Sequence, residues 1–290
     1  MNHYLVADHL FAIDALPEQL AQLSNYAPFL VSDVSEKPLF SIRVHLQDLP
    51  SAEGWEHVYT DRSDEDMPRI EMYRRKGAWL FCVSMYRDSD IVSVMQCSED
   101  WSEVNLYMND TCYTRFAIDN AAMLVYAFAT VEKKTLLFHS SVTVRHGFGC
   151  MFLGHSGTGK STHSRQWLEA FSDAELINDD NPVVRILEDN SVRVYGSPWS
   201  GKTPCYKNVS APVAALVQLA QAPHNSIAPL KMTQAYPFIL ASVSGLKVLP
   251  HMMDRLYESI AQLLELRPVY KLECLPNTDA AQLCAQTCLP

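Results

Sequence analysis

The most informative part of the sequence is a nine-residue stretch, GHSGTGKST, which occupies positions 154–162. It matches the pattern G-x-x-x-x-G-K-[S/T], in which glycines let successive backbone N–H groups turn toward phosphate oxygens. An apolar strand candidate at 150–153 precedes the stretch and a helical segment at 162–171 follows it. The loop would therefore end at a helix N-terminus, whose dipole favours an anion. This context predicts a nucleotide phosphate site rather than a plain glycine-rich turn.

We expect the whole stretch to bind ATP. The predicted nucleotide-binding residues are Gly154, His155, Ser156, Gly157, Thr158, Gly159, Lys160, Ser161 and Thr162. Lys160 would contact the β- and γ-phosphates as a point charge, and the Ser161 hydroxyl would coordinate Mg²⁺. His155 stands at a variable position of the pattern, so its identity is incidental.

A second candidate group follows about twenty residues later, where the apolar strand segment AELIN ends in Asp179 and Asp180. Adjacent side chains on a strand point to opposite faces, so both carboxylates reach one ion only if the strand has already ended. One would then hold Mg²⁺ and the other would accept the proton of an incoming hydroxyl. The alternative is an ordinary Asp-Asp-Asn-Pro turn. Beside the glycine stretch we favour the functional interpretation, and which aspartate is the base stays open.

His139 is the third candidate, at the end of the apolar segment that precedes the glycine stretch. An imidazole at this place would orient a carboxylate or contact a transferring phosphoryl group. A lone histidine is more often a structural hydrogen-bond partner, so the assignment depends on the other two groups.

Together these three segments resemble the catalytic domain of HPr kinase/phosphorylase. The resemblance rests on LFHSS at 137–141, the loop at 154–161 and NDD at 178–180, in the order and rough spacing of that family. The tail at 268–274 with its following helix is also similar, and the same loop type occurs in ATP-dependent phosphoenolpyruvate carboxykinase. The resemblance implies that Lys160 and Ser161 bind phosphate and Mg²⁺, that Asp179 or Asp180 is the base, and that His139 supports it.

One segment departs from the family pattern. Residues 195–203 read YGSPWSGKT and do not match the signature that supports phosphorolysis. They form either an acceptor- or phosphate-facing loop, with Lys202 neutralising charge, or a plain Pro/Gly loop. The reverse reaction and HPr itself as a substrate therefore do not follow from the resemblance.

The rest of the chain predicts two domains and an α+β fold. Alternating apolar residues at 40–46, 79–85, 92–97 and 104–108 predict strands without intervening helices, which is typical of an antiparallel sheet. A buried helix is expected at 117–131. We predict an N-terminal, mainly antiparallel β domain at 1–116. A P-loop α/β domain like those of HPr kinase and phosphoenolpyruvate carboxykinase is predicted at 117–290.

Composition narrows the partners and the compartment. The 290 residues are 48% hydrophobic and 19% charged, and they carry a formal net charge of −10, which argues against nucleic acid and anionic membranes as partners. The eight cysteines have neither disulfide nor zinc-knuckle spacing, although Cys284 and Cys288 would share a helix face. The first fifteen residues lack the features of a signal peptide. We therefore expect a cytoplasmic protein, and a homo-oligomer is possible.

The favoured function is an ATP- and Mg²⁺-dependent kinase. It would transfer the γ-phosphoryl group to a hydroxyl of a peptide, a protein or a small molecule, with serine the leading candidate. One alternative is a compact relative of phosphoenolpyruvate carboxykinase that acts on a small carboxylate, although 290 residues are too few for a full enzyme of that kind. The other alternative is a nucleotide-binding or peptide-recognition protein without turnover.

Overall fold

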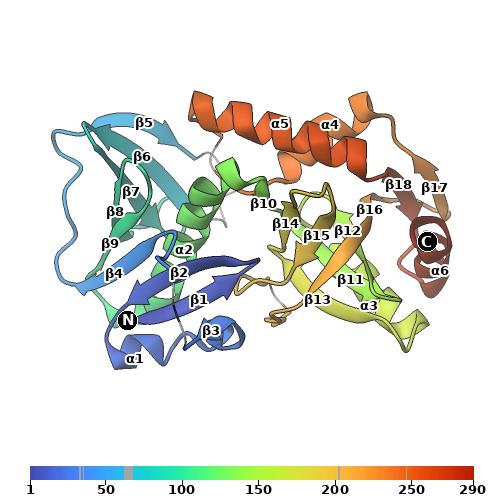
Figure 1. Cartoon of the computed structure of the whole chain (residues 1–290), viewed down its shortest axis with the longest axis horizontal. Coiled ribbons are helices and arrows are strands. Elements are labelled where there is room, and N and C mark those ends of the chain that lie inside the picture. The colour runs from blue at the N-terminus through green and yellow to red at the C-terminus, as the bar shows by residue number, and fades with distance from the viewer. Residues whose placement is uncertain (33, 35, 62–67, 202, 246) are drawn as a thin grey trace. The chain divides into compact units, whose positions relative to one another are not determined.

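The computed structural model describes residues 1–290 except 33, 35, 62–67, 202 and 246. Lys202 therefore lies outside the described residues, and so does the charge-neutralising role suggested for it. The chain divides into two compact units, Met1–Ala129 and Thr130–Pro290, coloured blue to green and green to red in Figure 1.

A mixed β-sheet forms the first unit, with nine strands among the described residues in the order β3-β1-β2-β4-β9-β8-β7-β6-β5. Its strands are β1 (Asn2–Val6), β2 (His9–Asp14), β3 (Leu30–Val31), β4 (Ser41–Leu46), β5 (Glu56–Thr60), β6 (Arg69–Arg75), β7 (Ala78–Ser84), β8 (Ile91–Ser98) and β9 (Glu103–Met108). The four strands expected from alternation are confirmed as β4, β7, β8 and β9. Most neighbours are antiparallel, as predicted, but β4 runs parallel to both β2 and β9.

The helices of the first unit are the short α1 (Pro17–Leu20) and the long α2 (Thr114–Thr130). Helix α2 packs on the sheet through Phe128, whose ring stacks on Trp101 with centroids 4.3 Å apart. The Tyr126 hydroxyl donates to the Val6 carbonyl over 3.0 Å. Our sequence boundary at 116/117 falls inside this helix, and the two units divide after Ala129 because these contacts hold α2 to the first sheet.

The second unit is built on another mixed sheet, in the order β10-β14-β15-β16-β12-β11-β13, with β18 pairing with both β16 and β17. Its strands are β10 (Thr135–Leu137), β11 (Ser140–Arg145), β12 (Phe148–Leu153), β13 (Glu175–Asp180), β14 (Val183–Ile186), β15 (Val192–Tyr195), β16 (Ser210–Gln221), β17 (Ser226–Pro229) and β18 (Val269–Cys274). Its helices are α3 (Lys160–Ala170), α4 (Met232–Ser242), α5 (Pro250–Leu266) and α6 (Thr278–Cys288).

A buried core beneath helices α3 and α6 fixes the strand that leads into the glycine stretch. Phe152 of β12 and Trp167 of α3 are fully buried in it, beside Val217 of β16 and Cys284 of α6. Burying this apolar surface stabilises the strand–loop–helix arrangement, and the loop between β12 and α3 is therefore held at both of its ends.

Among the described residues no helix combines the length and the apolar character needed to cross a membrane. All eight cysteines, each of which is described, are free thiols, and the Sγ atoms of Cys284 and Cys288 lie 3.9 Å apart on α6.

Candidate active site

The glycine loop, residues 154–159, joins β12 directly to α3. Gly157 and Gly159 have φ angles of 78° and 106°, a region that side chains with a Cβ rarely adopt. At Gly154 a Cβ would come within 2.9 Å of the Thr158 side chain. The conformation therefore requires glycine at these three positions, and it brings the chain onto the N-terminus of α3.

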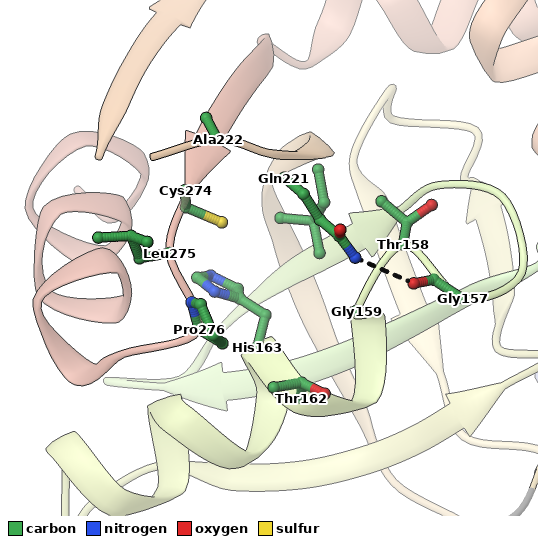
Figure 2. Close-up of a pocket in the computed structure, with 11 residues that line it drawn as sticks. Gly157, Thr158, Gly159, Thr162, His163, Gln221, Ala222, Cys274, Leu275 and Pro276 are labelled. Atoms are coloured by element: carbon green, nitrogen blue, oxygen red, sulfur yellow. Dashed lines mark hydrogen bonds between the residues drawn. The ribbon is translucent and has the colours of Figure 1, made fainter. Parts of the chain in front are cut away.

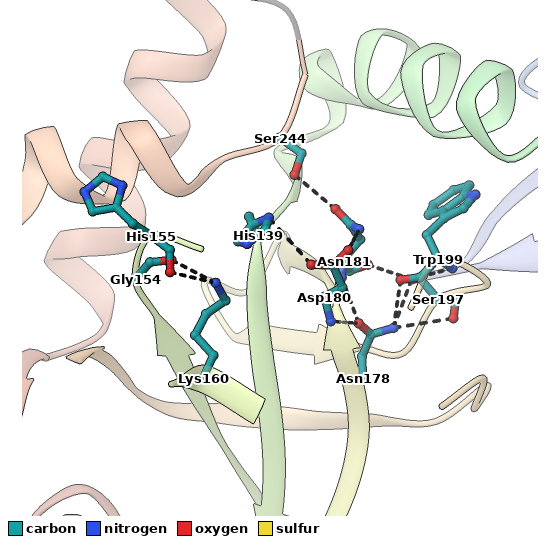
Figure 3. Close-up of polar contacts among 10 residues, drawn as sticks. All are labelled: His139, Gly154, His155, Lys160, Asn178, Asp180, Asn181, Ser197, Trp199 and Ser244. Atoms are coloured by element: carbon teal, nitrogen blue, oxygen red, sulfur yellow. Dashed lines mark hydrogen bonds and ion pairs between the residues drawn. The ribbon is translucent and has the colours of Figure 1, made fainter. Parts of the chain in front are cut away.

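Lys160, the first residue of α3, folds back over this loop. Its Nζ donates to the carbonyl oxygens of Gly154 and His155 over 2.9 and 3.4 Å (Figure 3). Burial lowers the pKa of Lys160, while Asp180 and Asp179 raise it. The ammonium group therefore lies within the electrostatic range of both predicted carboxylates.

Strand order brings the three predicted groups to one edge of the sheet. Strand β11 lies between β12 and β13 and is antiparallel to both. Its first residue, Ser140, pairs with Leu153 on one side and with Asp180 on the other. His139 precedes Ser140 and the glycine loop follows Leu153, so the loop, the imidazole and the carboxylate meet at the same end of these strands.

Asp180 is half-buried and makes two polar contacts. One carboxylate oxygen, Oδ1, lies 3.6 Å from His139 Nδ1, and the other, Oδ2, accepts a 2.8 Å bond from Asn181 Nδ2 (Figure 3). Burial raises the pKa of Asp180, although His139 and Lys160 lower it and Asp179 raises it further. Burial lowers the pKa of His139, against an increase from Asp180. A carboxylate with a raised pKa beside an imidazole is suited to accepting a proton.

Asp179 has different surroundings. Strand β13 continues through Asp180, so the strand has not ended before the pair, and the two side chains leave opposite faces of it. Asp179 is 6% exposed, and its Oδ1 accepts no hydrogen bond within the described part of the chain. A buried carboxylate oxygen without a donor is costly unless a cation satisfies it. Because the two carboxylates leave opposite faces of β13, a separate role for each is favoured over a shared one.

Asn178 was not among the predicted site residues, but it fixes the backbone that carries Asp180. Its buried Oδ1 accepts from the backbone N–H of Asp180 and Asn181 over 3.0 and 2.9 Å. Its Nδ2 donates to Ser197 Oγ over 3.1 Å (Figure 3). This amide therefore ties the aspartate pair to the loop that begins at Gly196.

The segment at 196–201 packs against the aspartate pair. Ser200 forms an isolated bridge with Asp180, and a Cβ at Gly201 would meet the Asp179 carbonyl oxygen at 2.9 Å. Its described residues are thus held by contacts with β13. The interpretation of this segment as a phosphate- or acceptor-facing loop rests on Lys202, which lies outside the described residues.

Two cavities flank the glycine loop. The larger, of about 550 Å³, is lined by residues 157–159, by Thr162 and His163 of α3, and by the ends of β16 and β18 (Figure 2). Gln221 lines this cavity, and its Nε2 donates to the Gly157 carbonyl over 3.3 Å. The smaller cavity, of about 330 Å³, adjoins residues 154–156 and His139. The loop thus has a partly open pocket at each end of its length.

The predicted catalytic residues His139, Lys160, Asp179 and Asp180 are neighbours in the structure, whereas their roles stay predictions. Ser161 is exposed at the start of α3, and no contact joins it to Asp179 or Asp180 within the described residues. Those residues also hold no group of three or more His, Cys, Asp or Glu side chains arranged for a metal ion.

His163 of α3 is a core residue. It is 3% exposed, it accepts a 3.1 Å bond from Trp167 Nε1, and its ring packs edge-on against Phe152. Burial lowers the pKa of His163 from 6.5 to about 4. The residue is therefore neutral at physiological pH and has a structural place in α3.

This burial predicts a loss of stability in acid. Between pH 6.5 and about 4 the unfolded chain binds a proton at His163 that the folded chain does not, so the free energy of unfolding decreases as the pH falls through this window. The loss should approach about 3 kcal/mol, since one pKa unit corresponds to about 1.4 kcal/mol. Urea unfolding at several pH values measures it. His163→Gln should flatten the dependence, whereas His251→Gln at an exposed site should not; an unaltered slope in His163→Gln would contradict the assignment.

Comparison with known proteins finds similar chains among solved structures. No family model matches the chain, and no curated protein matches its sequence. Among solved structures, the chain is similar to the Hpr(Ser) kinase/phosphatase from Coxiella burnetii, with 12% identity and a TM-score of 0.25. The match covers 45% of this chain and 90% of that one. This structural similarity is weak.

Proposed function

We propose that this chain is an HPr kinase-like phosphotransferase that moves the γ-phosphoryl group of ATP to a hydroxyl acceptor. The observation that carries the proposal is the pairing of Ser140 with both Leu153 and Asp180. This pairing puts a glycine loop, a lysine, an imidazole and a carboxylate with a raised pKa at one end of three adjacent strands. Phosphoryl transfer needs positioning and charge stabilisation of this kind more than it needs a covalent partner.

The nucleotide would lie along the glycine loop. Backbone N–H groups of the loop and the N-terminus of α3 would bind its phosphates. Lys160 would leave the carbonyl oxygens of Gly154 and His155 and contact the phosphates instead. The nucleoside would occupy the cavity that contains Gln221 and Thr162, which opens beside Gly157.

A magnesium ion fits the oxygen donors present at this site. Ser161 and Asp179 would hold it, because Asp179 has a buried oxygen without a hydrogen-bond donor among the described residues. When bound, Mg²⁺ neutralises charge on the phosphates. The remaining coordination positions would come from the nucleotide and water.

Asp180 is the better candidate for the base. It would accept the proton of the acceptor hydroxyl at its carboxylate while the hydroxyl oxygen forms a bond to the γ-phosphorus. The bond from that phosphorus to the β–γ bridging oxygen breaks, which leaves ADP and a phosphomonoester. Asn181 and His139 would orient the Asp180 carboxylate during this step, and Lys160 would stabilise the phosphate charge.

The direct test is the fate of labelled ATP. With Mg²⁺ and [γ-³²P]ATP, the wild-type protein should bind the nucleotide and turn it over, to water slowly and to hydroxyl compounds or serine peptides faster, and EDTA should stop both reactions. Absence of nucleotide binding would contradict the proposal. Binding without any turnover would favour the non-catalytic alternative. ATP formation from phosphoenolpyruvate, ADP and bicarbonate would favour the carboxykinase alternative.

A further inference from the structure

The smaller cavity beside the glycine loop lies on the base side of the site. Its volume is about 330 Å³. One wall consists of His139 and residues 154–156, and the other consists of Phe238 and residues 241–245 at the end of α4. Because the imidazole that contacts Asp180 is part of the wall, a molecule in this cavity lies beside the proposed base.

The opposite wall is also connected to the base. Ser244, which lines the cavity, donates from Oγ to Asn181 Oδ1 over 3.2 Å. Asn181 in turn donates to Asp180 Oδ2 over 2.8 Å (Figure 3). The wall itself is fixed to the strand of His139, since the His139 backbone N–H donates to the Ser242 carbonyl over 2.7 Å. The Asp180 carboxylate is therefore linked to both walls. Its Oδ1 contacts His139 on one wall, and its Oδ2 is linked through Asn181 to Ser244 on the other.

The described side chains that line the cavity carry no permanent charge. Its described residues include two imidazoles, one half-buried aromatic ring and small side chains, and no lysine, arginine, aspartate or glutamate. Two ammonium groups are near. Lys160 would be used by the nucleotide phosphates, and Lys247 is exposed and donates to the Val243 carbonyl over 2.7 Å. A carboxylate or phosphate group would thus approach Asp180 and the nucleotide phosphates without a cation dedicated to it.

We propose that this cavity is the acceptor subsite, and that it takes an uncharged hydroxyl-bearing molecule whose carbon face packs on Phe238. The hydroxyl would point between His139 and Asp180, where the proton is removed. Such a molecule is either a free polyol or the serine side chain of a peptide, because both present an alcohol on a neutral carbon frame. This inference rests on the proposed kinase function and adds to it the place and the charge class of the acceptor.

Ligand-observed NMR with named probes tests the inference on the whole chain in the presence of Mg²⁺ and a non-hydrolysable ATP analogue. The neutral probes are methyl glucoside for the polyol source and N-acetylserinamide for the peptide source, and the anionic probes are glycerate and malate. At least one neutral probe should bind about tenfold more tightly than either anion. Phe238→Ala should weaken the affinity of that neutral probe by about tenfold, as expected for loss of an aromatic wall. Lys247→Gln, the matched control on the same segment, should change it less than about twofold.

Each other result counts against the inference. Anions that bind as tightly as the neutral probes, or a loss of neutral binding in Lys247→Gln, would show that the cavity recognises charge. Binding unaffected by Phe238→Ala would place the acceptor elsewhere, and so would the absence of any probe binding while the ATP analogue is bound. Loss of the ATP analogue itself from the wild-type protein would instead contradict the proposed kinase function, so the two failures are distinguishable.

Discussion

Replacing Asp180 with asparagine is expected to slow phosphoryl transfer strongly and, at the same time, to stabilise the nucleotide-free protein. General-base catalysis contributes about 10²- to 10⁴-fold, so transfer from [γ-³²P]ATP should fall by a factor in that range. Nucleotide affinity should change much less, because the predicted phosphate contacts belong to the loop and Lys160. The Asn181 bond to position 180 should persist, since the new amide oxygen is able to accept it.

The stability effect follows from the direction of the pKa shift. Burial raises the pKa of Asp180 in the folded state. A carboxyl group with a raised folded-state pKa contributes stability only at low pH, and this contribution is lost as the pH rises through the folded-state pKa. At pH 7 the wild-type protein therefore carries an ionised group in unfavourable surroundings. The neutral amide removes that cost, so the thermal midpoint of Asp180→Asn should exceed that of the wild type at pH 7 and approach it in acid.

Asp254→Asn provides the matched control, because it makes the same chemical change at an exposed carboxylate on α5. Its transfer rate and thermal midpoint should stay near those of the wild type. An Asp180→Asn protein that retains full transfer would remove Asp180 from the role of base. A protein that loses both activity and stability would identify Asp180 as a structural residue instead.

The sequence was a good guide where a local pattern determines the structure. The glycine spacing at 154–159 predicts a loop between a strand and a helix, and the structure has β12 and α3 in these places. Alternating apolar residues likewise predicted β4 and β7 to β9. Local patterns do not predict strand order, because the order depends on contacts between segments that are distant in the sequence. Nothing local to β4 indicates that it runs parallel to both neighbours.

Strand β16 is the clearest example of an element that local sequence patterns did not predict. It lies next to β12, but its sequence SAPVAALVQLAQ is rich in alanine and does not alternate regularly between apolar and polar residues. It was therefore not predicted, and neither was Gln221 at its end. The polar run NDDN at 178–181 did contain a signal for Asn178 and Asn181, because both amides flank the aspartate pair. Ser244 and Phe238 had no such signal, since they reach the site only through the packing of α4.

Replacing Lys160 with methionine is expected to have the other large effect. Methionine keeps most of the volume of the side chain and removes its charge. In the proposed reaction the lysine stabilises negative charge on the phosphates, and loss of one such group typically costs about 10²- to 10³-fold in rate. Nucleotide binding should also weaken, which a fluorescent ATP analogue measures. Lys271→Met, at a partly exposed lysine on β18, serves as the control and should leave both quantities near their wild-type values.

The pH dependence of the residual activity makes this prediction specific to the site. Lys160 lowers the pKa of Asp180, so its removal should raise that pKa further and move the acid limb of the rate profile to higher pH. Lys160→Arg keeps the positive charge but changes its geometry, because a guanidinium is a planar fork and an ammonium is a compact point charge. Lys160→Arg should lower the transfer rate, but the acid limb of its pH–rate profile should stay closer to that of the wild type than the limb of Lys160→Met. Equal profiles in the methionine and arginine variants would show that Lys160 and Asp180 do not act on each other, and the two groups would then not belong to one catalytic centre.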